Sequence, residues 1–397
     1  MSNRFLHLFT LNLLLGWVAP TTAECQTSGS VEQLIELAWE HNNLFHPRFL
    51  LPEKKDGKDV EIEKTLFYFN KDENNLPPTG AALNVWGIQQ KMRFPTIYVH
   101  QNEVTKAESR MDAEEKKIQR LMVAREVCRQ YYNLMYYQQL QFAYAYLDSI
   151  YEDYFRTTEQ PAGTAYNFRK SALESRWQEV RLQHRQAQLS AIAALGSLKM
   201  AVQAEIPFSL DQLALRKVPS ADIQVEDHPG IAYFRQAQQA GALKTKVQKE
   251  MLLPDIQLEY FRGRNRVPNG PIYNGVQVGI AVPLFYGPQK ENVEAARSYE
   301  EKVHQQAENY VFSLTARMEQ LKTQRIYYLE SLNYYEVEWN PTKENTIRAI
   351  SESFSKGDID RIQYIEAMER MKVMEINYFN NLQGYNQVMI EMNYLSL

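Results

Sequence analysis

Apolar side chains recur with helical spacing over two long stretches of the chain. Residues 97–156 contain no proline, and their apolar positions follow one another at steps that alternate between three and four, with gaps. A helix of about sixty residues is about 90 Å long, because each residue adds about 1.5 Å. A second pattern of this kind runs from residue 288 to about residue 339. Helices of this length are rare in compact enzymes. The pattern positions are Val104, Ala107, Met111, Ile118, Leu121, Cys128, Tyr131, Met135 and Phe142 in the first stretch, and Val293, Ala296, Val303, Ala307, Tyr310, Leu314, Leu321 and Tyr328 in the second.

Each long helix is followed by a break and then by a returning helix. Residues 160–164, Q-P-A-G-T, form the first break, and the return runs from about residue 166 to residue 203. In the second half, Asn340-Pro341 predicts an interruption and the sequence K-G-D-I-D at 356–360 predicts a tight turn. The last return extends to about residue 395. The chain therefore predicts two long antiparallel helical hairpins.

Alternation of period two predicts β-strands next to these helices. Residues 255–262 place Ile256, Leu258 and Tyr260 on one face, and a turn-forming loop follows. Residues 274–282 repeat the alternation, so we expect a hairpin with one apolar face. Residues 64–70 and 82–93 predict a second, less regular hairpin in the first half. The apolar positions of the strand at 274–282 are Val276, Val278, Ile280 and Val282.

The apolar hairpin face has two interpretations. It is either one side of a half-buried sheet or the lipid-facing side of a transmembrane barrel with water inside. Both strands of the second hairpin approach the roughly nine to eleven tilted residues that cross a bilayer. The half-buried sheet is the commoner arrangement, and strand length favours the barrel, in which Val276, Val278, Ile280 and Val282 would form a lipid-facing strand.

The order of elements recurs at a separation of about 190 residues, which predicts an internal duplication. His46-Pro47 in the first half corresponds to His228-Pro229 in the second, and short matches lie at one constant offset. We expect a leader at residues 1–23, a first repeat at 24–210 and a second repeat at 211–397. The spacing from Pro229 to Pro254 leaves room for a helix, whereas the spacing from Pro47 to Pro52 does not. One helix of the first repeat is therefore expected to be lost. The matched residues are Val104, Ala107 and Ser109 with Val293, Ala296 and Ser298.

The first 23 residues have the features of a secretory signal: Arg4, an apolar run at 5–18 and small residues at 21–23. Glu24 precedes Cys25, which argues against lipid attachment at that cysteine. The formal net charge is −4, and removal of Arg4 with the leader makes it −5. This balance argues against a nucleic-acid partner. With only Cys25 and Cys128 in the chain, disulfides do not form its framework.

The sequence offers no recognisable catalytic motif. It contains no phosphate-binding P-loop, no dinucleotide glycine fingerprint and no H-E-x-x-H, and its seven histidines lack metal-ligand spacing. Met368, Met371 and Met374 recur every three residues, a spacing that suits soft copper ligands or a core stripe, of which the core stripe is the commoner arrangement. We therefore expect no enzyme, no cofactor and no resident metal.

Asp358, Asp360 and Arg361 lie at the second predicted helical turn. An aspartate near a helix start caps free backbone N–H groups and favours the positive end of the helix dipole. Carboxylates repeated around a symmetric pore would also form an acidic ring that selects cations. The two roles are compatible.

Several blocks of the second half resemble those of TolC-type outer membrane factors. They are H-P-G-I-A-Y-F-R-Q-A-Q-Q-A (228–240), L-L-P-D-I-Q-L-E-Y (252–260), G-V-Q-V-G-I-A-V-P-L-F (275–285) and S-F-S-K-G-D-I-D-R-I-Q-Y-I-E-A (353–367). In the first half, Q-K-M-R-F-P-T (90–96) is similar to the strand-to-helix junction of the heavy-metal (Cus-like) RND efflux branch. The order and spacing of the blocks carry the resemblance.

The resemblance implies a mainly α fold with a small β part. Long helical hairpins would form an α-barrel tunnel in the periplasm, and two β-hairpins per chain would contribute to a trimeric transmembrane β-barrel in the outer membrane of a Gram-negative bacterium. The homotrimer would export solutes, among them heavy-metal cations such as copper or silver. Alternatives are a non-conducting envelope scaffold and a channel for type I secretion or drug efflux.

The resemblance also assigns roles to the two turns. Gly163, Thr164, Gly357 and Asp358 would be the tips at which a periplasmic adaptor (membrane fusion) protein docks, while an inner-membrane RND pump supplies the energy. Asp358, Asp360 and Arg361 would lie at the aperture gate.

Overall fold

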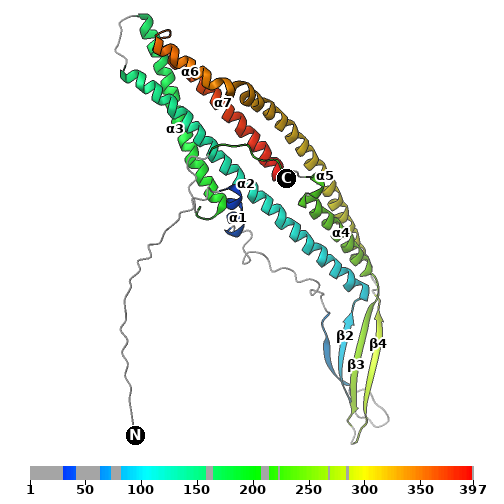
Figure 1. Cartoon of the computed structure of the whole chain (residues 1–397). Helices are drawn as coiled ribbons and strands as arrows, with labels where there is room; N and C mark the ends of the chain where they lie inside the picture. Colours follow the sequence, from blue (N-terminus) through cyan, green and yellow to red (C-terminus); the bar gives the residue numbers. More distant parts are fainter. Residues whose placement is uncertain are drawn as a thin grey trace, which may run out of the picture.

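The computed structural model describes residues 30–41, 63–72, 82–157, 164–206, 214–221, 224–266, 269–282 and 286–395. It is elongated, with long helices side by side and a β-sheet at one end (Figure 1). The predicted leader, Cys25, the pair His46-Pro47 and Gly163 lie outside the described residues. The mainly α fold with a small β part is confirmed.

The first predicted helical hairpin is confirmed. Helix α2, Pro95–Thr157, has 63 residues and is therefore about 95 Å long. Helix α3, Thr164–Val202, runs back along it (Figure 1). Helix α1, Val31–His41, packs on α2, where the Trp39 indole N–H donates to the Arg120 carbonyl at 3.3 Å.

The second long hairpin is also present, but the predicted interruption at Asn340-Pro341 is wrong. Helix α5, Gly287–Asn333, passes through a π-helical segment, η3, Tyr334–Trp339, directly into α6, Asn340–Lys356. A proline in a helix has no N–H and its ring collides with the carbonyl one turn earlier. The wider π turn just before Pro341 absorbs that conflict, so the chain bends without leaving the helix. Helix α7, Arg361–Asn393, then returns.

Helix α4, Pro229–Glu250, confirms the helix expected between Pro229 and Pro254 and packs against both α2 and α5. His228 begins it. The Nδ1 atom of His228 accepts the Gly230 N–H at 3.0 Å, and its Nε2 atom lies 2.6 Å from the Leu395 carbonyl oxygen. This buried histidine therefore ties the start of α4 to the end of α7. The stretch of the first half that is expected to lack the corresponding helix, 47–62, lies outside the described residues, so the loss of that helix stays a prediction.

Both predicted hairpins are confirmed, and together they make one antiparallel sheet in the order β1-β2-β3-β4. Strands β1, Leu66–Asp72, and β2, Leu83–Met92, come from the first half. Strands β3, Asp255–Asn265, and β4, Ile272–Ala281, come from the second. The two halves join where β2 pairs with β3, with Trp86 opposite Arg262 and Met92 opposite Ile256. None of the described helices has the length and hydropathy needed to cross a membrane.

The largest core lies where α1, α2, α3 and α7 meet, and it contains the predicted positions Cys128, Tyr131 and Met135. Ala107, Cys128, Tyr131 and Met135 are buried, but Phe142 is 48% exposed. After Met135, the buried positions follow one another mainly at steps of four residues. Because a helical turn has only 3.6 residues, the buried stripe gradually moves around the surface of α2. Phe142 therefore lies outside the stripe. These later buried positions are Ala143, Leu147, Tyr151 and Tyr154. In α5, Val293, Val303, Ala307, Leu314 and Leu321 are buried.

Two asparagines of α7 hold the extended connection at residues 214–221, which leads into the second half. The fully buried Asn386 accepts the Val218 N–H at 2.9 Å and donates to the Arg216 carbonyl at 2.8 Å. Three residues further along the same connection, Asn393 accepts the Ala221 N–H at 3.0 Å and donates to the Pro219 carbonyl at 2.8 Å. Each side chain thus serves one donor and one acceptor of the backbone.

We expect Asn386→Ala to lower the thermal unfolding midpoint more than Asn393→Ala does. The first change leaves buried backbone groups without partners, each at a cost of about 1–3 kcal/mol, whereas water can reach the groups at the second. Thermal unfolding followed by circular dichroism checks this. Equal losses in the two variants would contradict the role given to burial.

Candidate functional site

The four strands share one face that is mostly apolar from the row of Phe67 and Ile88 toward the helices. Reading across the sheet, Ile88 of β2 lies opposite Phe67 of β1 and Tyr260 of β3, and Tyr260 lies opposite Val276 of β4. The rows nearer the helices are Gln90, Leu258 and Val278, then Met92, Ile256 and Ile280. The predicted lipid-facing residues are highly exposed in the single chain: Val276 74%, Val278 68%, Ile280 72% and Val282 53%.

The first hairpin extends this face, which the sequence pattern did not reveal. Phe67 is 74% exposed and Trp86 is 65% exposed, and both share the face of Val276. The Phe69 and Trp86 rings contact each other with centroids 4.6 Å apart. Leu66, Tyr68 and Val85 on the opposite face hide the alternation in the sequence.

The opposite face of the sheet is polar. It carries glutamines and Glu259, whose carboxylate accepts a hydrogen bond from the Tyr68 hydroxyl. Rings of Tyr68 and Phe261 lie over their cross-strand partners Gly87 and Gly275, where a Cβ atom would overlap the ring. The sheet therefore has one side suited to lipid and one suited to water. The glutamines are Gln89, Gln257 and Gln277.

At the far end of the helices, the turn from α6 to α7 is closed by backbone hydrogen bonds. Gly357 adopts φ 78°, a left-handed conformation that glycine reaches without strain. Its N–H donates to the Phe354 carbonyl at 3.1 Å, and the Asp358 N–H donates to the Ser353 carbonyl at 2.9 Å. The Asp358 carboxylate is exposed and has no hydrogen bond or ion pair with any described residue.

Asp360 caps α7. It accepts the Gln363 N–H at 2.7 Å, and the Gln363 side chain accepts the Asp360 N–H at 2.8 Å. This reciprocal capping box confirms the predicted capping role of Asp360. The two aspartates therefore differ, since one has a structural task within its own chain and the other presents a charge to its surroundings.

Arg361 connects the turn to the neighbouring hairpin. Its Nη2 atom lies 2.5 Å from the Asp153 Oδ2 atom near the end of α2, and Arg156 also reaches Asp153 at 3.4 Å. Arg169 of α3 lies 3.9 Å from Asp360. Thr164 begins α3 on the same side, and Gly163 is outside the described residues. Sequence analysis missed Asp153 and Arg169, because their partners are about 200 residues away and no local pattern links them.

A partly buried chain of charges joins α6, α7 and α2 between the turn and the π segment. Glu375 accepts from Lys343 at 2.9 Å and from Lys372 at 2.6 Å. The Lys343 ammonium lies 5.1 Å from the Trp339 ring centre, and that of Lys372 lies 4.6 Å from the Tyr146 ring centre. Burial raises the pKa of the Glu375 carboxyl, but the two lysines outweigh it, and the pKa is lowered from its ordinary 4.5.

The apolar seam of α7 contains the methionines considered as copper ligands. Met368 is 3% exposed, while Met371 and Met374 are half-buried. In the part of the chain that the structure describes, no group of three or more His, Cys, Asp or Glu side chains is placed to hold a metal ion. The Cys128 thiol is buried, which raises its pKa to about 11.

The fold is that of outer-membrane channels. It is similar to the open state of the MtrE outer membrane channel of Neisseria gonorrhoeae, with a TM-score of 0.70 and 14% sequence identity over 92% of this chain and 88% of that one. The outer membrane protein VceC of Vibrio cholerae gives 0.67 and 14%, over 92% and 95%. CusC, described for conformational changes that accompany folding and transmembrane channel formation, gives 0.67 and 12%, over 91% and 90%. The sequence matches no protein-family model and no curated protein.

Glu375→Gln is expected to destabilise the purified protein by about 1–3 kcal/mol at pH 7, since it leaves two lysines without their carboxylate. A lowered pKa means that the ion pairs contribute fully above 4.5 and lose their effect as the pH falls through the folded value. The difference between variant and wild type should therefore shrink below pH 4.5.

Thermal unfolding from pH 7 to pH 4 checks this prediction, with the surface variant Glu319→Gln as the control. Glu319 pairs only with Lys322 at an exposed position and should change the midpoint little. A difference for Glu375→Gln that stays constant across this range would refute the assignment.

Proposed function

We propose that three copies of this chain form a channel-tunnel through which solutes leave a Gram-negative cell across its outer membrane. The apolar face that runs across all four strands carries this proposal. One chain leaves that face exposed to water, which is unfavourable for a soluble protein, whereas lipid is its natural solvent.

The open edges of the sheet support a shared barrel. Strands β1 and β4 are the outer strands of the four, so each has one side without a partner strand among the described residues. Unpaired backbone groups are not tolerated against lipid, and closure into a barrel removes them. A barrel of this kind needs at least about eight strands. Copies of the same chain supply the missing strands, and the resemblance of the sequence blocks to TolC-type outer membrane factors favours three.

The long helices set the length of the proposed tunnel. Helix α2 extends about 95 Å from the sheet to the turns, a length that supports turns reaching far into the periplasm. By resemblance, the turns at Gly163, Thr164, Gly357 and Asp358 dock a periplasmic adaptor protein, and an inner-membrane RND pump supplies the energy. The chain itself catalyses no reaction in this proposal. The duplication into 24–210 and 211–397 is part of the same proposal.

The gate is proposed at the same turns. Asp358 offers a free carboxylate there, and three copies would make an acidic ring. Arg361 links α7 to Asp153 of α2, so the two hairpins are held together next to that ring. Heavy-metal cations are the proposed cargo class, supported by the resemblance of the 90–96 block to the heavy-metal efflux branch. Drug efflux and type I secretion remain the alternative cargo classes.

Val278→Asp should block assembly into the outer membrane. A charge facing lipid near the bilayer centre costs about 2–4 kcal/mol for a basic residue and somewhat less for an acidic one. The matched control is Gln277→Asp, one position along β4 on the polar face, which should assemble normally. Cell fractionation and immunoblotting give the answer, and equal assembly of both variants would sink the lipid-facing assignment.

Replacing Asp358 and Asp360 by Asn should reduce cation selectivity in planar lipid bilayers. Asparagine caps a helix about as well as aspartate, so the change removes charge while it keeps the cap. Asp358→Asn alone tests the free carboxylate and should account for a measurable part of the shift in reversal potential. Unchanged selectivity in both variants would leave these residues as turn and cap residues only.

The same recordings separate a channel from a scaffold. A non-conducting scaffold of this shape would reach the membrane and give no current steps. Discrete conductance steps from the wild-type protein support the channel.

A further inference from the structure

Three arginines lie at the outer end of β3. Arg262 and Arg264 belong to the strand and alternate with Gly263 and Asn265. Arg266 directly follows the strand, and its N–H donates to the Ala82 carbonyl at 3.0 Å, which continues the pairing with β2, so the alternation extends to it and all three lie on the same side. Arg262 lies between Trp86 and Asn274, and Arg264 lies between Asn84 and Ile272. These rows continue the apolar face of Tyr260 and Val276. The arginines therefore lie on the face proposed to meet lipid.

We propose that Arg262, Arg264 and Arg266 bind the phosphate groups of phosphorylated glycolipids in the outer leaflet of the membrane. This inference rests on the proposed function, because it requires the apolar face of the sheet to contact lipid. A guanidinium binds phosphate through two parallel N–H donors and stays charged at every physiological pH.

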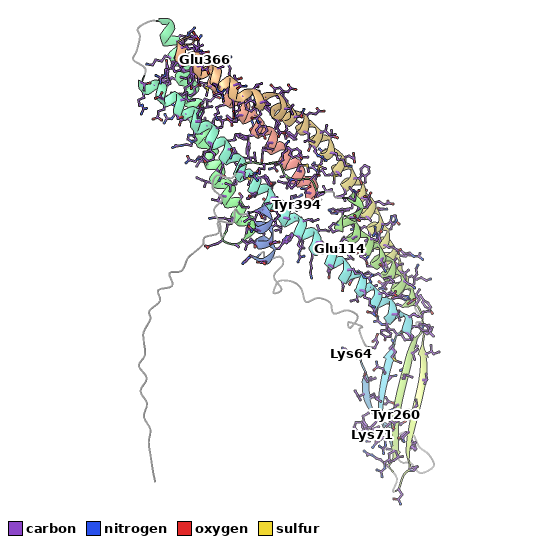
Figure 2. All side chains as sticks on the ribbon, viewed as in Figure 1. Lys64, Lys71, Glu114, Tyr260, Glu366 and Tyr394 are labelled. Atoms are coloured by element: carbon purple, nitrogen blue, oxygen red, sulfur yellow. The ribbon has the colours of Figure 1, made fainter. Side chains whose placement is uncertain are left out.

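The position of the arginines along the strand supports a headgroup site. They lie toward the end of the sheet remote from the helices: Arg262 is level with the aromatic pair of Phe69 and Trp86, and the other two arginines lie beyond that pair. Figure 2 labels Tyr260 and Lys71 toward the same end. Aromatic side chains gather at the level of lipid headgroups. An arginine facing lipid costs about 2–4 kcal/mol at the bilayer centre and about 0–1 kcal/mol near the interface. The three charges therefore belong at headgroup level.

The charge balance points to an external anion. At the end of the sheet near the helices, cations have partners in the chain, since Lys91 pairs with Asp255 at 2.9 Å and Arg93 pairs with Glu63 at 3.1 Å. Among the described residues, none forms an ion pair with Arg262, Arg264 or Arg266. The sequence contains no Asp or Glu between Glu259 and Glu291. Three exposed guanidinium groups thus face outward without a nearby carboxylate in β3 or β4.

The spacing suits a ligand with more than one phosphate. Alternate residues of a strand are about 6.6 Å apart, so the three guanidinium groups form a ladder about 13 Å long at the Cα atoms. A single small anion engages only part of such a ladder. A glycolipid headgroup that carries two phosphates on adjacent sugars, or two neighbouring headgroups, engages more of it.

The test measures binding of a fluorescent glycolipid with two phosphates to the full chain, purified in neutral detergent. We expect the wild type to bind it and the variant R262Q/R264Q/R266Q to bind at least about tenfold more weakly, since charge-assisted contacts are lost. The matched control R110Q/K64Q/K290Q removes the same charge from exposed positions on α2, before β1 and on α5, and should bind like the wild type. The same glycolipid without phosphates should bind neither protein well.

Three results would overturn the site: equal weakening in the control, binding that does not depend on the glycolipid phosphates, or full competition by equimolar inorganic phosphate. If the triple variant does not fold, R264Q alone must weaken binding. Conductance of the wild type tests the channel separately. A conducting protein without phosphate-dependent binding sinks only this inference, and a non-conducting protein that binds in a phosphate-dependent way sinks only the channel.

Discussion

An exposed apolar face on a sheet with two open edges is the constraint on which the rest of the structure depends. Strands β1 and β4 each leave one row of backbone groups without a partner strand, and Val276, Val278 and Ile280 are about 70% exposed. Neither feature is stable in water for a monomer. In the channel proposed above, copies of the chain would cover the edges and lipid would cover the face. The polar opposite face, with Glu259 and its neighbouring glutamines, would then surround water.

The contacts between the helices hold the two long helical hairpins in register along their length. Helix α2 contacts α3, α4 and α7 at successive levels, so it serves as the axis of the subunit. Polar contacts fix each level: His228 joins α4 to the end of α7, Asn386 holds the connection between the halves, and Glu375 joins α6 to α7. Near the turns, Asp153 and Arg361 join the two hairpins. Ion pairs at exposed ends are weak and separable, which is compatible with the gate proposed at these turns.

Much of this fold follows from periodicity alone. The helical steps predicted α2 and α5, and the alternation from 274 to 282 predicted β4 and its apolar face. The apolar face of the first β-hairpin was harder to predict, because Leu66 and Tyr68 on one side are as apolar as Phe67 and Phe69 on the other. Only the pairing with β3 shows which side shares the face of Val276. Phe142 was assigned to the core because a fixed pattern ignores the drift of the buried stripe along α2.

At the turn between α6 and α7, the sequence predicted the local structure but not the contacts with distant parts of the chain. A Gly and an Asp in the expected places predicted the turn and the cap at Gly357 and Asp360. The partner of Arg361 is 208 residues away, and the π segment before Pro341 reflects packing that a proline rule treats as a break. Contacts of this kind depend on where the hairpins lie in space, so local sequence does not reveal them.

Cysteine accessibility along β4 in intact outer membranes tests the central claim most directly. In a background with Cys25→Ser and Cys128→Ala, single cysteines are placed at positions 276 to 280 and treated with a water-soluble, membrane-impermeant maleimide. The account predicts labelling at positions 277 and 279 and protection at 276, 278 and 280. Labelling at all five positions, or protection at all five, would contradict a strand with lipid on one side and water on the other.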